Sequence, residues 1–218
     1  MKPFLSISLV VAWALFAGCN FVAGVSGSGK VVTENRNVSG FDSIAFSGSG
    51  KLEVDQNGTE SLSISADDNL LPLLTSEVVG TRLVLKVRPD SRVRPSQRIV
   101  YKIGANKLNE VACAGNTSAV LRNIHTDNLK LEIAGSGDIS ADGTSDQQSV
   151  SIAGSGKYNG AGLKSKSASI NISGAGDAVM AASETLNVNV AGSGSIKYIG
   201  EPKITQNIMG SGTIEQQK

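Results

Sequence analysis

The sequence has few aromatic residues and almost no excess of charge of either sign. Phe, Trp and Tyr together make up 4% of 218 residues, which argues against a globular enzyme core built on aromatic side chains. Lysine plus arginine (20) nearly equals aspartate plus glutamate (19), so we expect no nucleic-acid partner. Glycine, by contrast, occurs 25 times, which favours a thin stacked core with many tight turns.

Histidine and cysteine are also scarce, and this limits the kinds of site to expect. The one histidine is His125, and no group of His and Cys residues has the spacing of a metal site, so we expect neither a metal nor another cofactor. A hydrolytic triad could combine His125 with Asp127 and a nearby serine. No serine lies in a nucleophile elbow, however, and the serines belong to repeated turns, so we predict a loop or surface histidine.

Residues 1–18 have the pattern of a secretory signal peptide. Lys2 precedes an apolar run from Leu5 to Phe16, and small residues come before Cys19. The run is shorter than the roughly 20 apolar residues of a transmembrane helix. The Phe-Ala-Gly-Cys segment resembles the lipobox of bacterial lipoproteins, although Phe16 stands where leucine is usual. This resemblance implies that Cys19 carries acyl chains, palmitate among them; the alternative is an ordinary signal peptide with an incidental cysteine.

The acylated cysteine would anchor the protein to a membrane, because several acyl chains on one residue hold stably. Asn20 follows Cys19 where an inner-membrane retention signal would have Asp, so we expect the outer membrane, on either face. Residues 19–29 are predicted to form a flexible, lipid-anchored tether. Cys113 would then be the only free thiol, in a position that the repeats otherwise fill with Ile or Val, and we predict it to be buried.

The second half of the chain is periodic. Five segments align without gaps around a Gly-x-Gly motif: 131–139, 150–158, 170–178, 188–196 and 206–214. A period near 19 indicates a solenoid whose units cannot bury their apolar faces alone, and helical repeats are longer, about 33 residues or more. Apolar and polar residues alternate within each unit, which is strand periodicity. The sequence therefore predicts an all-β, single-stranded parallel β-helix with coils of about 18–20 residues.

Equivalent positions of the repeat should form ladders along this β-helix. The position four before the first glycine holds Val111, Leu131, Val150, Ile170 and Val188, and the position two before it is also apolar. Both rows are predicted to point inward, while the polar position between them points outward. The outward row can form hydrogen bonds along the axis; it consists of Glu132, Ser151, Asn171, Asn189 and Asn207.

The first half is less regular and is predicted to cap the solenoid. We divide residues 30–218 into an irregular, capping part (30–105) and regular coils (106–218). Residues 67–74 have an acidic start and Pro72 near the first turn, which predicts a short capping helix. Few residues follow Ile214, so the last coil is weakly covered, and we expect end-to-end or side-by-side association of copies.

A cluster of six basic residues lies within 17 residues of the first half, where Asp90 is the one acidic residue. It consists of Arg82, Lys86, Arg88, Arg92, Arg94 and Arg98. Solvated strand edges and a loop would explain it without any function. The functional alternative is contact with an anionic glycolipid or headgroup, which clustered arginine suits.

Several motifs of the chain resemble the family named "putative autotransporter adhesin, head GIN domain". The resemblance covers nearly the whole mature chain and is carried by 27–29, 38–44, 48–54, 67–72 and 83–85. It implies a parallel β-helix in an exported, often lipid-anchored protein, and it carries over no catalytic residue.

The resulting expectation is a non-enzymatic envelope lipoprotein that binds a protein or glycan in the manner of an adhesin, or acts as a scaffold. The alternative is a carbohydrate-active enzyme or polysaccharide-binding protein on a β-helix, with Asp138, Asp142 and Asp177 in a Ca²⁺ or sugar groove. A purely structural role as an envelope spacer is the third possibility.

Overall fold

The computed structural model describes residues 24–217, which form strands and one 3₁₀ turn. The elements are β1 (Gly24–Ser26), β2 (Val31–Arg36), β3 (Ser43–Asp55), β4 (Ser61–Asp67), η1 (Leu71–Leu73), β5 (Leu74–Val79), β6 (Arg82–Val87), β7 (Arg92–Arg94), β8 (Val100–Gly104), β9 (Glu110–Gly135), β10 (Asp138–Gly154), β11 (Lys157–Gly174), β12 (Asp177–Gly192), β13 (Ser195–Ile199), β14 (Lys203–Gly210) and β15 (Thr213–Gln216).

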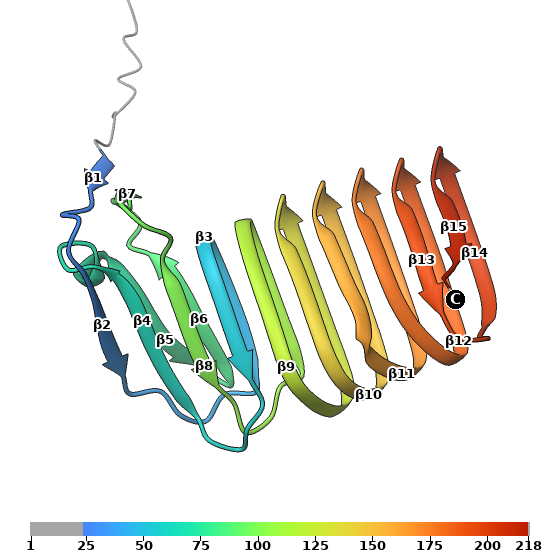
Figure 1. Ribbon diagram of the computed structural model, residues 1–218, viewed down its shortest axis with the longest axis horizontal. Helices are drawn as coiled ribbons and strands as arrows, with labels where there is room; N and C mark the ends of the chain where they lie inside the picture. The colour runs from blue at the N-terminus through green and yellow to red at the C-terminus, as the bar shows by residue number, and fades with distance from the viewer. Residues whose placement is uncertain (1–23, 218) are drawn as a thin grey trace, which may run out of the picture.

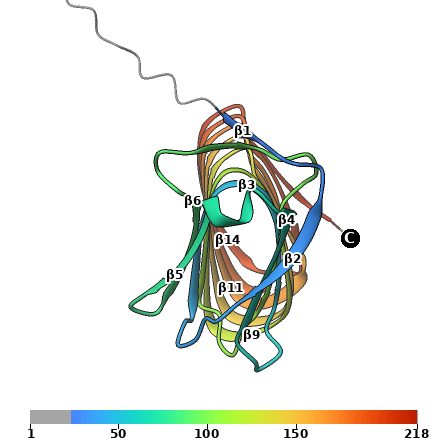
Figure 2. The ribbon, with the colours of Figure 1, turned by 90° about the vertical axis from the view of Figure 1, so that its left-hand side faces the viewer.

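Long strands β9 to β12 bend through successive coils of a parallel β-solenoid with about five turns, which confirms the predicted fold class. Neighbouring coils pair in parallel and in register, so that Val150 of β10 lies between Leu131 of β9 and Ile170 of β11. Figure 1 shows the coils side by side, and Figure 2 shows their flattened outline from the N-terminal end. We call the edge where the Gly-x-Gly turns lie the glycine edge, and the opposite edge the bend edge.

The first glycines of the repeats stack in a column along the glycine edge. Gly154 has a φ of +125°, and a Cβ at this position would collide with the carbonyl oxygen of Gly135 on the coil below. That oxygen accepts a hydrogen bond from the N–H of Ser155 at 3.0 Å. Gly48 begins the column through its pairing with β9. Glycine is therefore required here by both backbone conformation and close approach.

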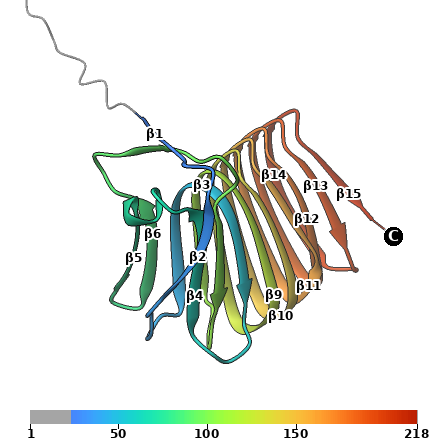
Figure 3. The ribbon, with the colours of Figure 1, turned by 60° about the vertical axis from the view of Figure 1, so that its left-hand side comes forward.

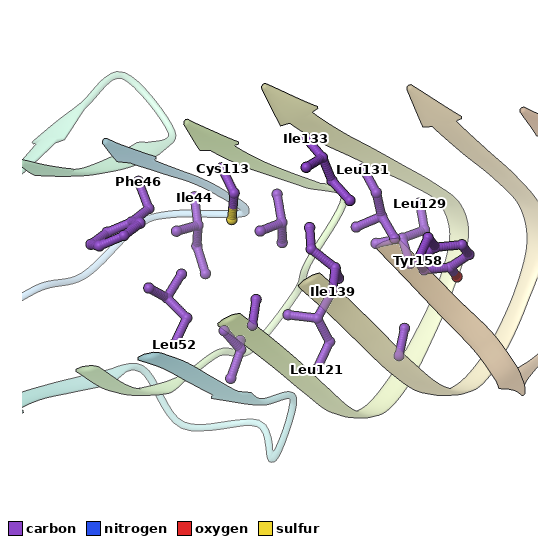
Figure 4. Close-up of a cluster of buried hydrophobic side chains, with 14 of the residues drawn as sticks. Ile44, Phe46, Leu52, Cys113, Leu121, Leu129, Leu131, Ile133, Ile139 and Tyr158 are labelled. Carbon is purple, nitrogen blue, oxygen red and sulfur yellow. The ribbon is translucent and has the colours of Figure 1, made fainter. Parts of the chain in front are cut away.

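Both apolar ladders predicted from the repeat point into the core. The members with less than 4% exposure are Val111, Leu131, Val150, Ile170 and Val188 in one row, and Cys113, Ile133, Ile152, Ile172 and Val190 in the other. Figure 4 shows Cys113 among these aliphatic side chains. Burial raises the pKa of the Cys113 thiol to about 12, so it stays protonated and inert at neutral pH.

A buried polar network occupies the core where β11 and β12 change register. Their pairing skips three residues after Gly160, and the Ala181 carbonyl accepts hydrogen bonds from the Gln148 amide (2.9 Å) and the Ser165 hydroxyl (2.7 Å). The Tyr158 hydroxyl donates to Gln148 Oε1 at 3.0 Å. The side chains thus satisfy the polar groups that the irregular pairing leaves in the core.

Antiparallel strands close the N-terminal end of the solenoid. Strand β2 pairs with β4, β4 pairs with β8, and the β5–β6 hairpin joins β3 (Figure 3). The turn η1 lies in the middle of this end in Figure 2, and Leu70, Leu71 and Leu74 are buried beneath it. These leucines cover the apolar interior that the first coil would otherwise expose to water.

The segment predicted as a short capping helix, 67–74, differs from the prediction. Only Leu71–Leu73 form a 3₁₀ turn, and its N-cap is Leu70, which makes no side-chain capping bond. Asp67 ends β4, and its carboxylate binds the N–H groups of Gly29 and Ser96 instead of the start of a helix. An apolar run buried against the end of the core favours one packed turn over an amphipathic helix.

The last coil, β13 to β15, is only partly covered at the C-terminal end. Ile204, Ile208 and Ile214 pack against the core while half-buried, and Met209 is 65% exposed. The inward position paired with Val188 is occupied by Gln206, so the apolar ladder ends in a polar residue.

The strands and core contacts given above all lie within residues 24–217, so a chain that begins at Gly24 retains all of them.

Candidate functional site

A groove runs along the bend edge across six successive levels of the solenoid. Its volume is about 1030 Å³. It is roughly 24 Å long, because neighbouring coils are about 4.8 Å apart. We call it the edge groove; its lining includes Lys107, Asn109, His125, Thr126, Asp127, Thr144, Ser145, Asp146, Lys164, Ser165, Lys166, Ala182, Ser183 and Glu201.

In four of these levels, one position of the bend is occupied by a small residue that forms the floor of the groove. The floor row consists of Thr126, Ser145, Ser165 and Ala182, which are paired from coil to coil. The three last members are at most 7% exposed. Longer polar side chains on either side are exposed and form the walls. Sequence reasoning missed this site, although the small residue at a fixed place in each bend was a signal for it.

The charged groups of the groove include both signs. Lys166 Nζ lies 2.8 Å from a carboxylate oxygen of Asp146, and this hydrogen bond raises the pKa of Lys166. Lys107 and Lys164 stand among Asp127 and Glu201 in the same lining. Because three lysines and three carboxylates share the lining, the groove offers hydrogen-bonding partners without a strong net field.

His125 lies in this groove on the surface, as predicted, and its surroundings are those of a structural contact. Its Nδ1 is 2.9 Å from the hydroxyl of Thr144 on the next coil. No hydrogen bond joins the ring to Asp127 in the part of the chain that the structure describes. The imagined Ser–His–Asp set is therefore not assembled.

The basic cluster of the sequence is divided by the fold. Arg82 begins β6 at the bend edge and forms an ion pair with Glu110. Lys86 lies half-buried farther along the same strand. The remaining four arginines belong to the crossing from β6 to β8 at the glycine edge, which we call the arginine segment: Arg88, Arg92, Arg94 and Arg98.

Strand β7, in the middle of the arginine segment, pairs in parallel with β1. Gly24 lies opposite Arg92, and Ser26 lies opposite Arg94. The Gly27 N–H also donates to the Arg94 carbonyl at 2.9 Å. The arginine segment is thus held beside the first described residues of the chain, as Figure 1 shows at the upper edge.

Asp67 holds three segments together at the same corner. Its carboxylate accepts hydrogen bonds from the N–H of Gly29 at 2.8 Å, from the N–H of Ser96 at 2.9 Å, and from the Ser96 hydroxyl. The Ser96 hydroxyl and these backbone donors lower the pKa of Asp67. We call this arrangement the Asp67 clasp; the Gly-Ser-Gly triplet at Gly27 belongs to it and not to the glycine column.

The three aspartates considered for a Ca²⁺ or sugar groove do not form one set. Asp138 and Asp177 flank Lys157 on neighbouring coils. Asp142 lies instead at the bend edge, where it accepts a hydrogen bond from the Asn123 N–H at 3.2 Å. Within residues 24–217 no group of three His, Cys, Asp or Glu side chains has the arrangement of a metal site.

The predicted signal peptide, the lipidation site Cys19 and residues 20–23 of the predicted tether lie outside the described residues. Residues 24–29 of that tether are held in place by the pairing of β1 with β7 and by the Asp67 clasp. None of the helical segments within residues 24–217 has the length and apolar character needed to cross a membrane.

The sequence model of a family described as "Putative auto-transporter adhesin, head GIN domain" matches residues 40–202. The match begins before β3 and ends after β13, so it includes the cap from β4 onward and the coils up to β13. Among curated proteins, none matches the chain.

Solved structures from Bacteroides and Parabacteroides species share the fold. A "putative adhesin" from Bacteroides fragilis NCTC 9343 is 26% identical with a TM-score of 0.73, over 89% of this chain and 100% of that one. A "putative lipid binding protein" from Parabacteroides distasonis ATCC 8503 is 27% identical with a TM-score of 0.57, over 90% and 100%. A "putative adhesin" from Parabacteroides merdae ATCC 43184, 22% identical over 89% and 99%, has a TM-score of 0.61.

Proposed function

Because the chain belongs to the auto-transporter adhesin head GIN domain family, we propose that it is a non-enzymatic binding module of the cell envelope that holds a glycan in the edge groove. The observation that carries the proposal is the place of this groove. It lies on the bend edge, whereas β1, where the described chain begins, lies at the glycine edge (Figure 1). A module attached through its N-terminus would therefore turn the groove away from its point of attachment.

The chemistry of the groove favours a glycan over an extended peptide. Peptides commonly bind β proteins by adding a strand to a free edge, but the coils along the groove already pair with one another. What the groove offers is side chains: hydroxyls of Thr126 and Thr144, the amide of Asn109, and charges of both signs. Such groups can bind the hydroxyl groups of several successive sugar units in an open, straight groove.

The attachment in this proposal is the acylated Cys19, which lies five positions before Gly24, in the outer membrane. Asn20 in place of an aspartate supports that address. A relative of 27% identity that is described as lipid binding supports a role at a lipid surface. The alternative of a carbohydrate-active enzyme lacks an assembled catalytic set among the described residues.

The proposal is tested by filling the groove. Ser183 is exposed in its lining, so Ser183→Trp should place an indole where the ligand binds, whereas Ser173→Trp puts the same group at an exposed position outside it. On an array of envelope glycans, we expect Ser183→Trp to lower the affinity at least about tenfold, equal to about 1.4 kcal/mol, and the control to retain it.

Equal binding by wild type and Ser183→Trp would show that the groove is not the ligand site. Release of shorter sugars from a bound glycan, abolished by His125→Ala, would instead support the enzymatic alternative and contradict the non-enzymatic part of the proposal.

A further inference from the structure

The arginine segment has a face that its own strand geometry exposes. In β7, Val93 is half-buried and packs against the core, so Arg92 and Arg94 point to the other side and are exposed. Arg88 precedes this strand and Arg98 follows it, both exposed. The fold thus gathers four guanidinium groups in one surface crossing.

These arginines are not used to stabilise the fold through ion pairs. Within residues 24–217, the arginines that form ion pairs are Arg36 and Arg82. Asp90 is the one carboxylate within the segment, and no ion pair joins it to these arginines among the described residues. The buried carboxylate of Asp67 binds Ser96 of the segment and forms no ion pair with its arginines among those residues. Like charges held close together without ion-pair partners repel one another, so this arrangement costs stability unless an anion is bound.

The position of the segment indicates which anion. It pairs with β1 at Gly24, which lies five positions after Cys19. Five extended residues reach at most about 18 Å, which keeps the segment within one short span of an acyl anchor on that cysteine. The Asp67 clasp fixes it there through Ser96. An anchored module would therefore present this face, and not the edge groove, to the membrane surface.

We infer that the arginine segment binds the anionic headgroups of the membrane that carries the protein and so sets the orientation of the module. Guanidinium groups form paired hydrogen bonds with phosphate oxygens, and basic residues beside a membrane anchor are attracted to anionic lipids. The inference rests on the proposed function only in requiring a membrane nearby, and it does not depend on what the edge groove binds.

The test uses a chain that begins at Gly24, which lacks Cys19 and retains every described contact. Vesicles of phosphatidylcholine with about a third phosphatidylglycerol should sediment with this protein, whereas pure phosphatidylcholine should not. The triple substitution Arg88→Gln, Arg92→Gln and Arg94→Gln should weaken binding on the order of 100-fold, because each basic residue near an anionic surface contributes about a fivefold factor.

The matched control removes three exposed lysines far from β1: Lys157→Gln, Lys197→Gln and Lys203→Gln. It should bind like the wild type, and about 1 M salt should abolish binding by screening. Equal weakening by both triple variants would show attraction by net charge alone and overturn the inference, as would unchanged binding by the arginine variant. Full competition by millimolar inorganic phosphate would show an ion site and not a lipid surface. If the wild-type protein bound vesicles but bound no glycan, the proposed function of the edge groove would be contradicted and this inference would stand.

Discussion

At the residue scale, the glycine column shows how one side-chain atom decides whether coils can stack. Each first glycine combines a positive φ with a backbone approach from the coil below that leaves no room for a Cβ. The middle residue of the turn, such as Ser155, is exposed and does not have a positive φ.

Replacement of one glycine in the column should therefore destabilise the whole stack. Gly154→Ala forces an alanine into the left-handed region, which costs about 1–3 kcal/mol, and brings its Cβ against the Gly135 carbonyl. We expect the free energy of unfolding to fall by at least about 2 kcal/mol in denaturant titrations. The matched change Ser155→Ala should stay within about 0.5 kcal/mol; an equal loss in the two variants would show that the column is not the critical feature.

At the scale of elements, the Asp67 clasp joins the segment before β2, the end of β4 and the arginine segment. Its hydrogen bonds are stronger for a carboxylate than for a neutral acid, so the folded state lowers the pKa of Asp67. This contribution to stability is fully present above the ordinary pKa of 3.8 and is lost as the pH falls through the lower folded value.

The substitution Asp67→Asn tests this element directly. It leaves one acceptor oxygen for three donors, so the variant should be less stable than wild type at pH 7 and should lose less stability on acidification. Thermal unfolding between pH 7 and pH 3 measures both effects. Asp146→Asn, at an exposed position in the edge groove, serves as the control, and identical pH profiles for wild type and Asp67→Asn would contradict the assignment.

At the scale of the whole molecule, the solenoid is a stack in which each coil contacts only its neighbours. The spacing from Gly174 to Gly192 equals that from Gly192 to Gly210, and the coil of β12 has the same register as the one that follows it. A complete coil can therefore be removed while β11 finds an equivalent partner.

Deletion of residues 175–192 should leave a cooperatively folded β protein with a lower melting temperature, because one layer of buried aliphatic side chains is lost. Deletion of residues 175–183, about half a coil, should abolish cooperative unfolding, because inward and outward positions no longer match. Circular dichroism with thermal melts checks both. Similar behaviour of the two deletions would be incompatible with a coil of this length.

Association of copies through the partly covered last coil stays a prediction, and light scattering at high protein concentration tests it.

The amino-acid sequence is sufficient to predict the repeating coil. The spacing of Gly115, Gly135 and Gly154 and the alternation around them specify the strands, the turn and the inward rows, because a local repeat encodes contacts between equivalent positions. Which residues meet at each edge of the solenoid depends on the tertiary structure. The edge groove depends on the stacking of small residues from separate coils. The division of the basic cluster depends on β7 pairing with β1, and the clasp joins Gly29, Asp67 and Ser96. These partners lie far apart along the chain, so no local pattern could have brought them together.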